Sequence, residues 1–66
     1  MVVKINGKEE IITEKLTLSE FVSNRGLCFD KIVIEHNSLI VAKENCEEII
    51  LEENDNLEIV SFVGGG

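Results

Sequence analysis

Three consecutive glycines, Gly64, Gly65 and Gly66, follow directly on the β-branched and apolar run 58–63. Glycine lacks Cβ and adopts almost any φ/ψ, so such a run can lie extended in a channel too narrow for other residues. The carboxylate of Gly66 would then reach a partner's active site. A carboxylate becomes reactive when it attacks the α-phosphate of ATP, because a sulfur or nitrogen nucleophile can displace the resulting anhydride. The alternative is an inert chain end, where disorder concentrates.

The length of the chain bounds what else it can do. At 66 residues it forms one domain, and a chain of this size buries only about 60% of its unfolded surface. Such a domain has little room for a catalytic pocket, which disfavours an independent enzyme. The chain is 44% hydrophobic and has no proline, so it is too apolar to be disordered.

The charge is strongly acidic, with 13 Asp and Glu against 6 Lys and Arg and a formal net charge of −7. Nucleic acid and anionic membrane surfaces would be repelled, whereas a partner with a basic groove would be attracted. A solvated acidic face that only keeps the protein soluble is the alternative for any one carboxylate. No signal-peptide pattern or long apolar run occurs, which predicts a cytoplasmic protein without a membrane span.

Cys28, Cys46 and His36 are the remaining candidates for chemistry. We expect both cysteines to be reduced and buried, and to pack as small apolar side chains. A metal site needs more ligands than these three residues offer at their spacing, so none is predicted. His36 ends a β-like run and has no nucleophile nearby in sequence, which favours a structural or solvated role over a catalytic one.

The first half of the chain carries clear local signals. Asn6-Gly7 joins an alternating run over 1–6 to a second run over about 9–14, which predicts a hairpin with a type I′ turn. Thr17-Leu18-Ser19-Glu20 fits a capping box at the start of one short helix. The helix buries Leu18, Phe21 and Val22 and carries the stem of Arg25 beside them; Gly26 ends it, with Leu27 as hydrophobic partner.

Strands dominate the second half. We expect a strand over 32–36 and a return strand over 39–41. A helical turn is expected within 42–48, with Cys46 and then Ile50 or Leu51 in the core. A turn at 54–56 leads to a last strand over 57–63. In the last strand Leu57 and Ile59 share one face, and Val60 and Phe62 share the other. If the first pair faces the core, the second forms an exposed docking patch. A bulge or loop that covers Phe62 is the alternative.

The order of these elements predicts an α+β fold in which a small mixed sheet packs on one main helix. With the first strand in the middle, parallel to the last, the connection is right-handed. This is the β-grasp, or ubiquitin-like, arrangement. The expected division is a domain over 1–63 and a flexible glycine tail over 64–66.

The whole chain resembles the ThiS family of sulfur carriers in thiamin biosynthesis. The resemblance rests on the early Asn6-Gly7, on residues 17–22 and 33–37, and above all on residues 54–66, which match the family's terminal signature closely. The chain departs from the family pattern in having Asn54 before the Asp of the last turn, Ser38 after Asn37, and Cys46 in place of an aromatic residue. Asn tolerates the left-handed region, so the last turn should survive.

The resemblance implies a carrier rather than an enzyme, with no bound cofactor. An adenylating enzyme of the ThiF type would use ATP to activate Gly66, and sulfur from a donor such as a cysteine desulfurase would leave a thiocarboxylate. That group would supply a thiazole synthase of the ThiG type. Gly64 and Gly65 would give reach, Val60 and Phe62 would dock, and Glu58 would steer a basic partner.

Three other functions stay open. The chain could resemble the small subunit of molybdopterin synthase, another carrier with a thiocarboxylate. It could be a ubiquitin-like protein modifier, joined to lysines through the same terminus. It could also be an interaction module whose glycines do nothing, in which case removal of Gly65 and Gly66 leaves its activity intact.

Overall fold

The computed structural model describes residues 1–62. The predictions for Gly64, Gly65 and Gly66, and the boundary between a domain over 1–63 and a tail over 64–66, lie outside the described residues. No helix within residues 1–62 is long and apolar enough to span a membrane.

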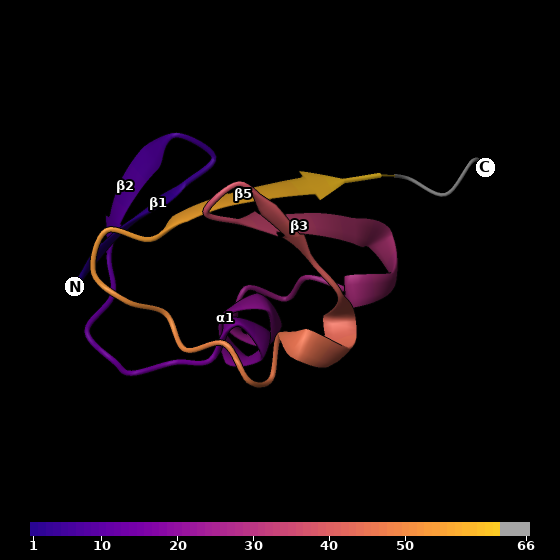
Figure 1. The fold of residues 1–66 in the computed structure, drawn as a ribbon, viewed down its shortest axis with the longest axis horizontal. Coiled ribbons are helices and arrows are strands. Elements are labelled where there is room, and N and C mark those ends of the chain that lie inside the picture. The colour runs from indigo at the N-terminus through magenta and orange to yellow at the C-terminus, as the bar shows by residue number, and fades with distance from the viewer. Residues whose placement is uncertain (63–66) are drawn as a thin grey trace.

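The described residues form a mixed sheet with one helix on one of its faces (Figure 1). The elements in chain order are β1 (Val2–Ile5), β2 (Lys8–Ile11), α1 (Leu18–Asn24), a 3₁₀ turn (Phe29–Lys31), β3 (Ile32–His36), β4 (Leu39–Val41), a second 3₁₀ turn (Lys43–Asn45) and β5 (Asn56–Ser61). The predicted architecture of a small mixed sheet on one helix is confirmed.

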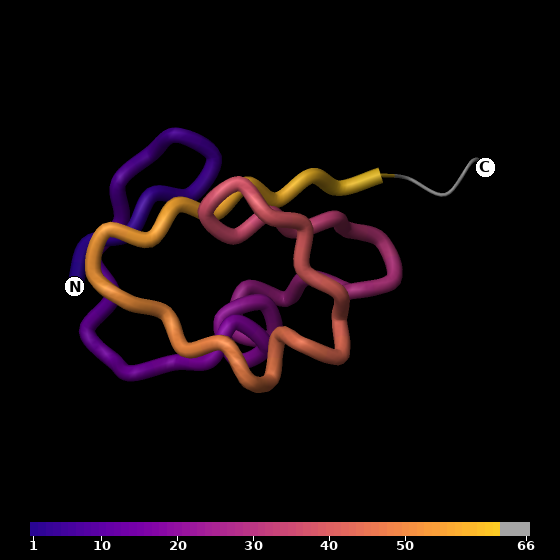
Figure 2. The backbone as a smooth tube through the Cα atoms, in the orientation of Figure 1, coloured from indigo at the N-terminus to yellow at the C-terminus, as the bar shows by residue number. Residues whose placement is uncertain are grey.

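The order of strands across the sheet is β2-β1-β5-β3-β4, and β1 is parallel to β5 as predicted. The middle position, however, belongs to β5 and not to the first strand. The reason is that β1 occupies one edge of β5 and β3 pairs with the other edge over five residue pairs. The β3–β4 hairpin therefore extends the sheet on the side of β5 away from β1. The chain path in Figure 2 shows β5 running between the two hairpins.

The first hairpin turns at Asn6-Gly7, as predicted, with φ of 52° and 85°. These positive angles at both central residues are those that a type I′ turn requires. The second strand is shorter than expected, since it ends at Ile11. Ile11 pairs with Val2 on the sheet face away from the helix and is 78% exposed, while Ile12 is buried.

Helix α1 begins at the predicted capping box. The Thr17 hydroxyl accepts a hydrogen bond from the Glu20 amide at 3.0 Å, and the Glu20 carboxylate accepts one from the Thr17 amide at 2.9 Å. At the other end Gly26 is left-handed, with φ of 71°, and the Leu27 amide bonds to the Val22 carbonyl at 3.2 Å. Both ends of the helix are therefore fixed by local sequence.

Replacing Thr17 with Ala is expected to lower the free energy of unfolding by about 1 kcal/mol, because the Glu20 amide loses its acceptor. Urea unfolding monitored by circular dichroism measures this change. Thr13→Ala is the matched control, since Thr13 is exposed and outside the helix, and it should change the free energy little. Equal effects of the two substitutions would contradict a stabilising cap.

The core lies between α1 and the sheet, and its buried apolar residues are Val3, Ile12, Leu18, Phe21, Val22, Ile32, Ile34, Cys46, Leu51 and Leu57. Cys46 is buried as predicted, and burial, aided by the charge of Glu44, raises the pKa of its thiol. Of the two candidates after it, Leu51 enters the core and Ile50 is 44% exposed.

The prediction that Cys28 is buried is wrong, because its thiol is exposed. Cys28 has an extended backbone between Leu27 and Phe29, both of which pack against the core. In an extended segment successive side chains point in opposite directions, so Cys28 faces solvent.

Candidate functional site

Strand β5 has one buried face and one exposed face, and it leads to the glycines at the end of the sequence. Leu57 is fully buried and Ile59 packs against the core, whereas Val60 is 58% exposed and Phe62 is 48% exposed. The predicted alternation is confirmed, and the alternative of a covered Phe62 is wrong. The docking role of Val60 and Phe62 stays a prediction.

The exposed apolar surface is larger than the sequence analysis expected. Val33 pairs with Val60 across β3 and β5, and Ile40 on β4 pairs with Glu35, two residues further along β3. Both are exposed, Val33 at 40% and Ile40 at 73%. With Val60 and Phe62 they form the outer apolar patch, on the sheet face away from α1. Alternation within 32–36, with Ile32 and Ile34 buried, is the signal that could have identified Val33.

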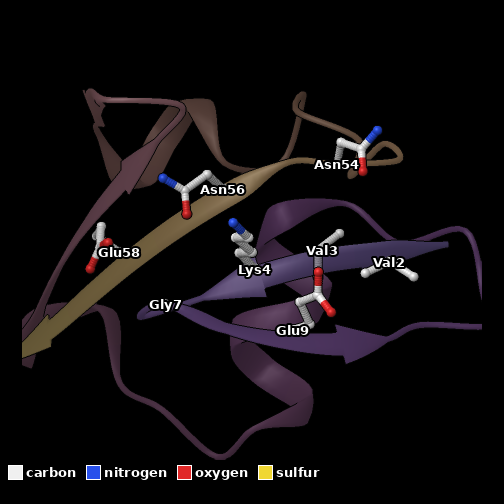
Figure 3. A pocket seen from close by; sticks show the side chains of 8 residues that line it. All are labelled: Val2, Val3, Lys4, Gly7, Glu9, Asn54, Asn56 and Glu58. Atoms are coloured by element: carbon white, nitrogen blue, oxygen red, sulfur yellow. The ribbon is translucent and has the colours of Figure 1, made fainter.

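Charged residues adjoin this patch on the same sheet face. Glu58 lies opposite Glu35 in the β3–β5 register, and both Glu58 and Lys4 line a hollow of about 490 Å³ together with Glu9. Figure 3 shows Lys4 rising from β1 between Glu58 and Glu9, with Asn56 above it on β5. Within residues 1–62 Lys4 has no ion-pair partner. Exposed charges without partners suit electrostatic attraction of another protein, as proposed for Glu58.

Asp55 anchors the start of β5 and is the buried charged residue that the sequence analysis missed. Its carboxylate accepts hydrogen bonds from the His36 ring nitrogen Nε2 at 2.9 Å, from the Glu52 amide at 2.9 Å and from the Asn37 side-chain amide at 3.1 Å. His36 thus has a structural partner, in line with the role predicted for it. Since His36 and Asp55 are 19 residues apart, no local spacing could have paired them.

The environment of Asp55 changes its acidity. Burial acts to raise the pKa of the carboxyl, but the hydrogen bonds from His36, Glu52 and Asn37 outweigh burial and lower the pKa below its ordinary value. A carboxyl with a lowered pKa in the folded state binds protons more readily in the unfolded chain. The stability that it contributes is therefore complete above about pH 4 and is lost as the pH falls through the lower folded value.

Asp55→Asn is expected to reduce the free energy of unfolding by about 1–3 kcal/mol at pH 7, because its NH₂ group cannot accept the bonds of the carboxylate. The difference from the original chain should shrink as the pH falls below about 4, where the original loses its own contribution. Urea titrations between pH 7 and pH 2.5 measure both effects. A difference that stays constant over that range would rule out ionised Asp55 as the source.

Asn6 has a second role besides the turn. Its side-chain amide donates to the Ile59 carbonyl at 3.1 Å, and its side-chain oxygen accepts from the Ile59 amide at 2.7 Å. The Asn6 side chain therefore makes the two hydrogen bonds to β5 that a further peptide group of β1 would make. It holds β5 at the point where β1 turns away. The sequence predicted the turn and gave no sign of this contact, since Ile59 is 53 residues away.

The fold, the outer apolar patch and strand β5 define a class of protein. It is a small β-grasp domain with an exposed apolar sheet face beside the strand that precedes its glycines in the sequence. A sequence model of the ThiS family matches residues 2–66, and the chain therefore belongs to the ThiS family. The predicted family and fold are both confirmed.

Individual proteins agree with this assignment. The chain is 33% identical over 64 residues to the sulfur carrier protein ThiS of Bacillus subtilis (strain 168), with 96% of the chain and 97% of the relative covered. The crystal structure of the thiamine biosynthesis protein ThiS from Geobacter metallireducens superposes with a TM-score of 0.83 at 25% identity, and both chains are fully covered.

A longer relative has a segment of the same kind. The chain is 34% identical over 62 residues to a thiazole synthase of Paramagnetospirillum magneticum. The matched region covers 94% of this chain and 19% of that enzyme. The chain thus corresponds to about a fifth of the length of this relative.

Proposed function

We propose that the chain is a sulfur carrier of thiamin biosynthesis whose Gly66 carboxylate is converted to a thiocarboxylate. The observation that carries the proposal is the match to the ThiS family, which extends through the glycines to residue 66. The likeness to the Bacillus subtilis sulfur carrier over nearly its whole length supports it. In this role the chain is a co-substrate of partner enzymes and binds no cofactor itself.

The proposed chemistry has three steps. A carboxylate oxygen of Gly66 attacks the α-phosphate of ATP on a ThiF-type enzyme, and pyrophosphate leaves. A persulfide sulfur, supplied by a donor such as a cysteine desulfurase, attacks the acyl carbon, and AMP leaves. A thiol then reduces the resulting S–S bond and releases the thiocarboxylate. Adenylation is needed because AMP is a far better leaving group than oxide.

A thiazole synthase of the ThiG type is the proposed acceptor of the sulfur. The support is the thiazole synthase of Paramagnetospirillum magneticum, where a segment similar to this chain is part of the enzyme's own polypeptide. A cytoplasmic location stays a prediction. No observation favours a molybdopterin-synthase subunit or a protein modifier over this assignment.

Intact mass spectrometry tests the proposal. The chain is incubated with ATP, a ThiF-type enzyme and a sulfide source. We expect the mass gain of one oxygen replaced by sulfur, localised to Gly66 by fragmentation. No change with an enzyme that is active on an authentic carrier would refute the carrier function. The chain would then be an interaction module with an inert terminus.

Phe62→Asp should raise the KM of the ThiF-type enzyme for the carrier tenfold or more, because a charge replaces an aromatic anchor of the outer apolar patch. The kcat for adenylation should change little, since Phe62 is outside the reacting group. Ile11→Asp is the matched control: Ile11 is also an exposed apolar residue of the sheet but lies on β2, away from the patch. An equal rise in KM for both variants would refute docking through Phe62.

A further inference from the structure

Among residues 1–62, strand β5 has a free edge beyond the point where β1 turns away. The parallel pairing of β1 with β5 consists of Lys4 with Asn56 and Ile5 with Leu57. The side chain of Asn6 then bonds to both backbone groups of Ile59. After Ile59, no residue of β1 or its turn continues the ladder, so the next groups on this side of β5 belong to Ser61.

The direction of the Ser61 peptide groups follows from the register. In an antiparallel pair, residues alternate between those that bond to the partner strand and those that point away from it. Ile59 points towards β1, because its amide bonds to Asn6, and Ser61 is two residues further along. The Phe62 amide bonds to Lys31 on the β3 side, which fixes the same alternation. The Ser61 N–H and C=O therefore point away from β3, and the pairing of β1 with β5 ends before Ser61, so no residue of 1–62 bonds to them.

A hollow of about 290 Å³ lies beside this free edge, on the helix side of the sheet. Its apolar lining comes from Ile5, Leu27 and Ile59, with the Phe21 ring on the wall formed by α1. The hollow is thus lined by residues of β1, β5 and α1 and has Ser61 on its rim.

Arg25 is the charged residue of this hollow. Its guanidinium carbon is 4.7 Å from the centre of the Phe21 ring, and two of its nitrogens bond to the Glu10 carboxylate. This hydrogen-bonded contact lowers the pKa of the Glu10 carboxyl and raises the pKa of the Arg25 guanidinium. A guanidinium has five N–H donors, and the Arg25 side chain is 42% exposed, so donors remain for another acceptor.

We propose that the adenylating partner adds an extended segment to β5 at Ser61, in the place that β1 leaves open. The segment bonds through its main chain to the Ser61 N–H and C=O, inserts an apolar side chain into the hollow and places an acidic side chain beside Arg25. An extended backbone fits because a row of unpaired peptide groups at a sheet edge is a template to which another chain can add a strand. The proposal rests on the carrier function, which requires the enzyme to hold the strand that leads to Gly66.

The comparison of Ser61→Pro with Ser61→Ala tests the role of the Ser61 backbone N–H, because both variants lose the hydroxyl and only proline loses the N–H. Proline removes the N–H and fills the edge with its ring, and it breaks no hydrogen bond within residues 1–62 because this N–H points away from β3. Steady-state adenylation, followed by ATP–pyrophosphate exchange, should give a KM for Ser61→Pro at least tenfold above that of Ser61→Ala, with similar kcat. Equal KM values would overturn the proposal.

Ile11→Pro controls for proline in a strand edge. The Ile12 amide bonds to Met1, so the neighbouring Ile11 amide points away from β1 at the outer edge of β2. This variant should keep the KM of the original chain. If it raises the KM as much as Ser61→Pro does, the effect belongs to proline in the sheet and the proposal fails.

Hydrogen exchange supplies a readout that needs no variant. In the free domain the Ser61 amide should exchange fast, whereas the Val60 amide, which faces β3, should be protected. With saturating ThiF-type enzyme the Ser61 amide should slow by at least tenfold. An unchanged rate, while the same enzyme adenylates the chain, overturns strand addition and leaves the carrier function standing. Absence of adenylation of the original chain refutes the carrier function itself.

Discussion

Deletion of Gly65 and Gly66 is expected to abolish sulfur loading and to leave the stability of the domain unchanged. The activated carboxylate must reach the α-phosphate of ATP inside the partner, and two residues of extended chain span about 7 Å. A carboxylate withdrawn by that distance cannot react, since positioning errors of 1 Å already cost large factors in rate. Intact mass spectrometry after incubation with ATP, ThiF-type enzyme and sulfide should show no mass gain.

The shortened chain also serves as its own control for docking and folding. Its urea unfolding should match that of the original chain, because within residues 1–62 the last buried core residue is Leu57, with Ile59 packed against the core. It should also compete with the original chain for the adenylating enzyme, since the outer apolar patch is intact. Sulfur loading at its new terminal residue would show that the length of the glycine arm is unimportant and would contradict the proposed role of Gly65 and Gly66.

Leu57→Ala is expected to destabilise the domain by about 2–5 kcal/mol, from lost apolar transfer energy and the cavity left behind. Leu57 is fully buried in the central strand, with Ile5 and His36 as its neighbours in register. Natural domains are stable by only about 5–15 kcal/mol, and small ones are at the lower end. A large part of the chain population should therefore unfold near body temperature.

Thermal unfolding by circular dichroism measures this effect. A loss of 1 kcal/mol shifts the Tm of a domain of this size by about 4–8 °C, so the expected shift is about 8 °C or more. Val60→Ala is the matched control on the same strand: Val60 is 58% exposed, and its truncation should shift the Tm by only a few degrees. Similar shifts for the two variants would contradict the central place of Leu57 in the core.

The features that could be predicted from the sequence are those with short-range causes. Asn6-Gly7 specifies its turn through backbone preference, Thr17 and Glu20 form a cap three residues apart, and alternation in β5 separates Leu57 from Val60. Each signal is complete within a few residues. The order of elements then left few arrangements, which is why the sheet and its single helix were correctly predicted.

The features that could not be predicted depend on residues that only the folded chain brings together. The bond between His36 and Asp55, and the clasp of Asn6 on Ile59, join segments 19 and 53 residues apart. The central position of β5 in the sheet depends on its pairing with β3, which also joins residues far apart in the sequence. The outer apolar patch was half predicted, because Val60 and Phe62 follow from one strand whereas Ile40 comes from another strand of the sheet.

The place of β5 in the sheet also has a consequence during protein synthesis. Within the sheet the β1–β2 and β3–β4 hairpins share no ladder with each other and are joined by β5, whose residues 56–61 are translated after the other strands. An isolated two-stranded hairpin is at best marginally stable in water. A nascent chain interrupted before residue 56 lacks the strand that joins the two hairpins, and it is therefore expected to be much less stable and more open to proteases. Cells are thus not expected to accumulate folded but prematurely terminated copies that would occupy the partner enzymes without a tail to load.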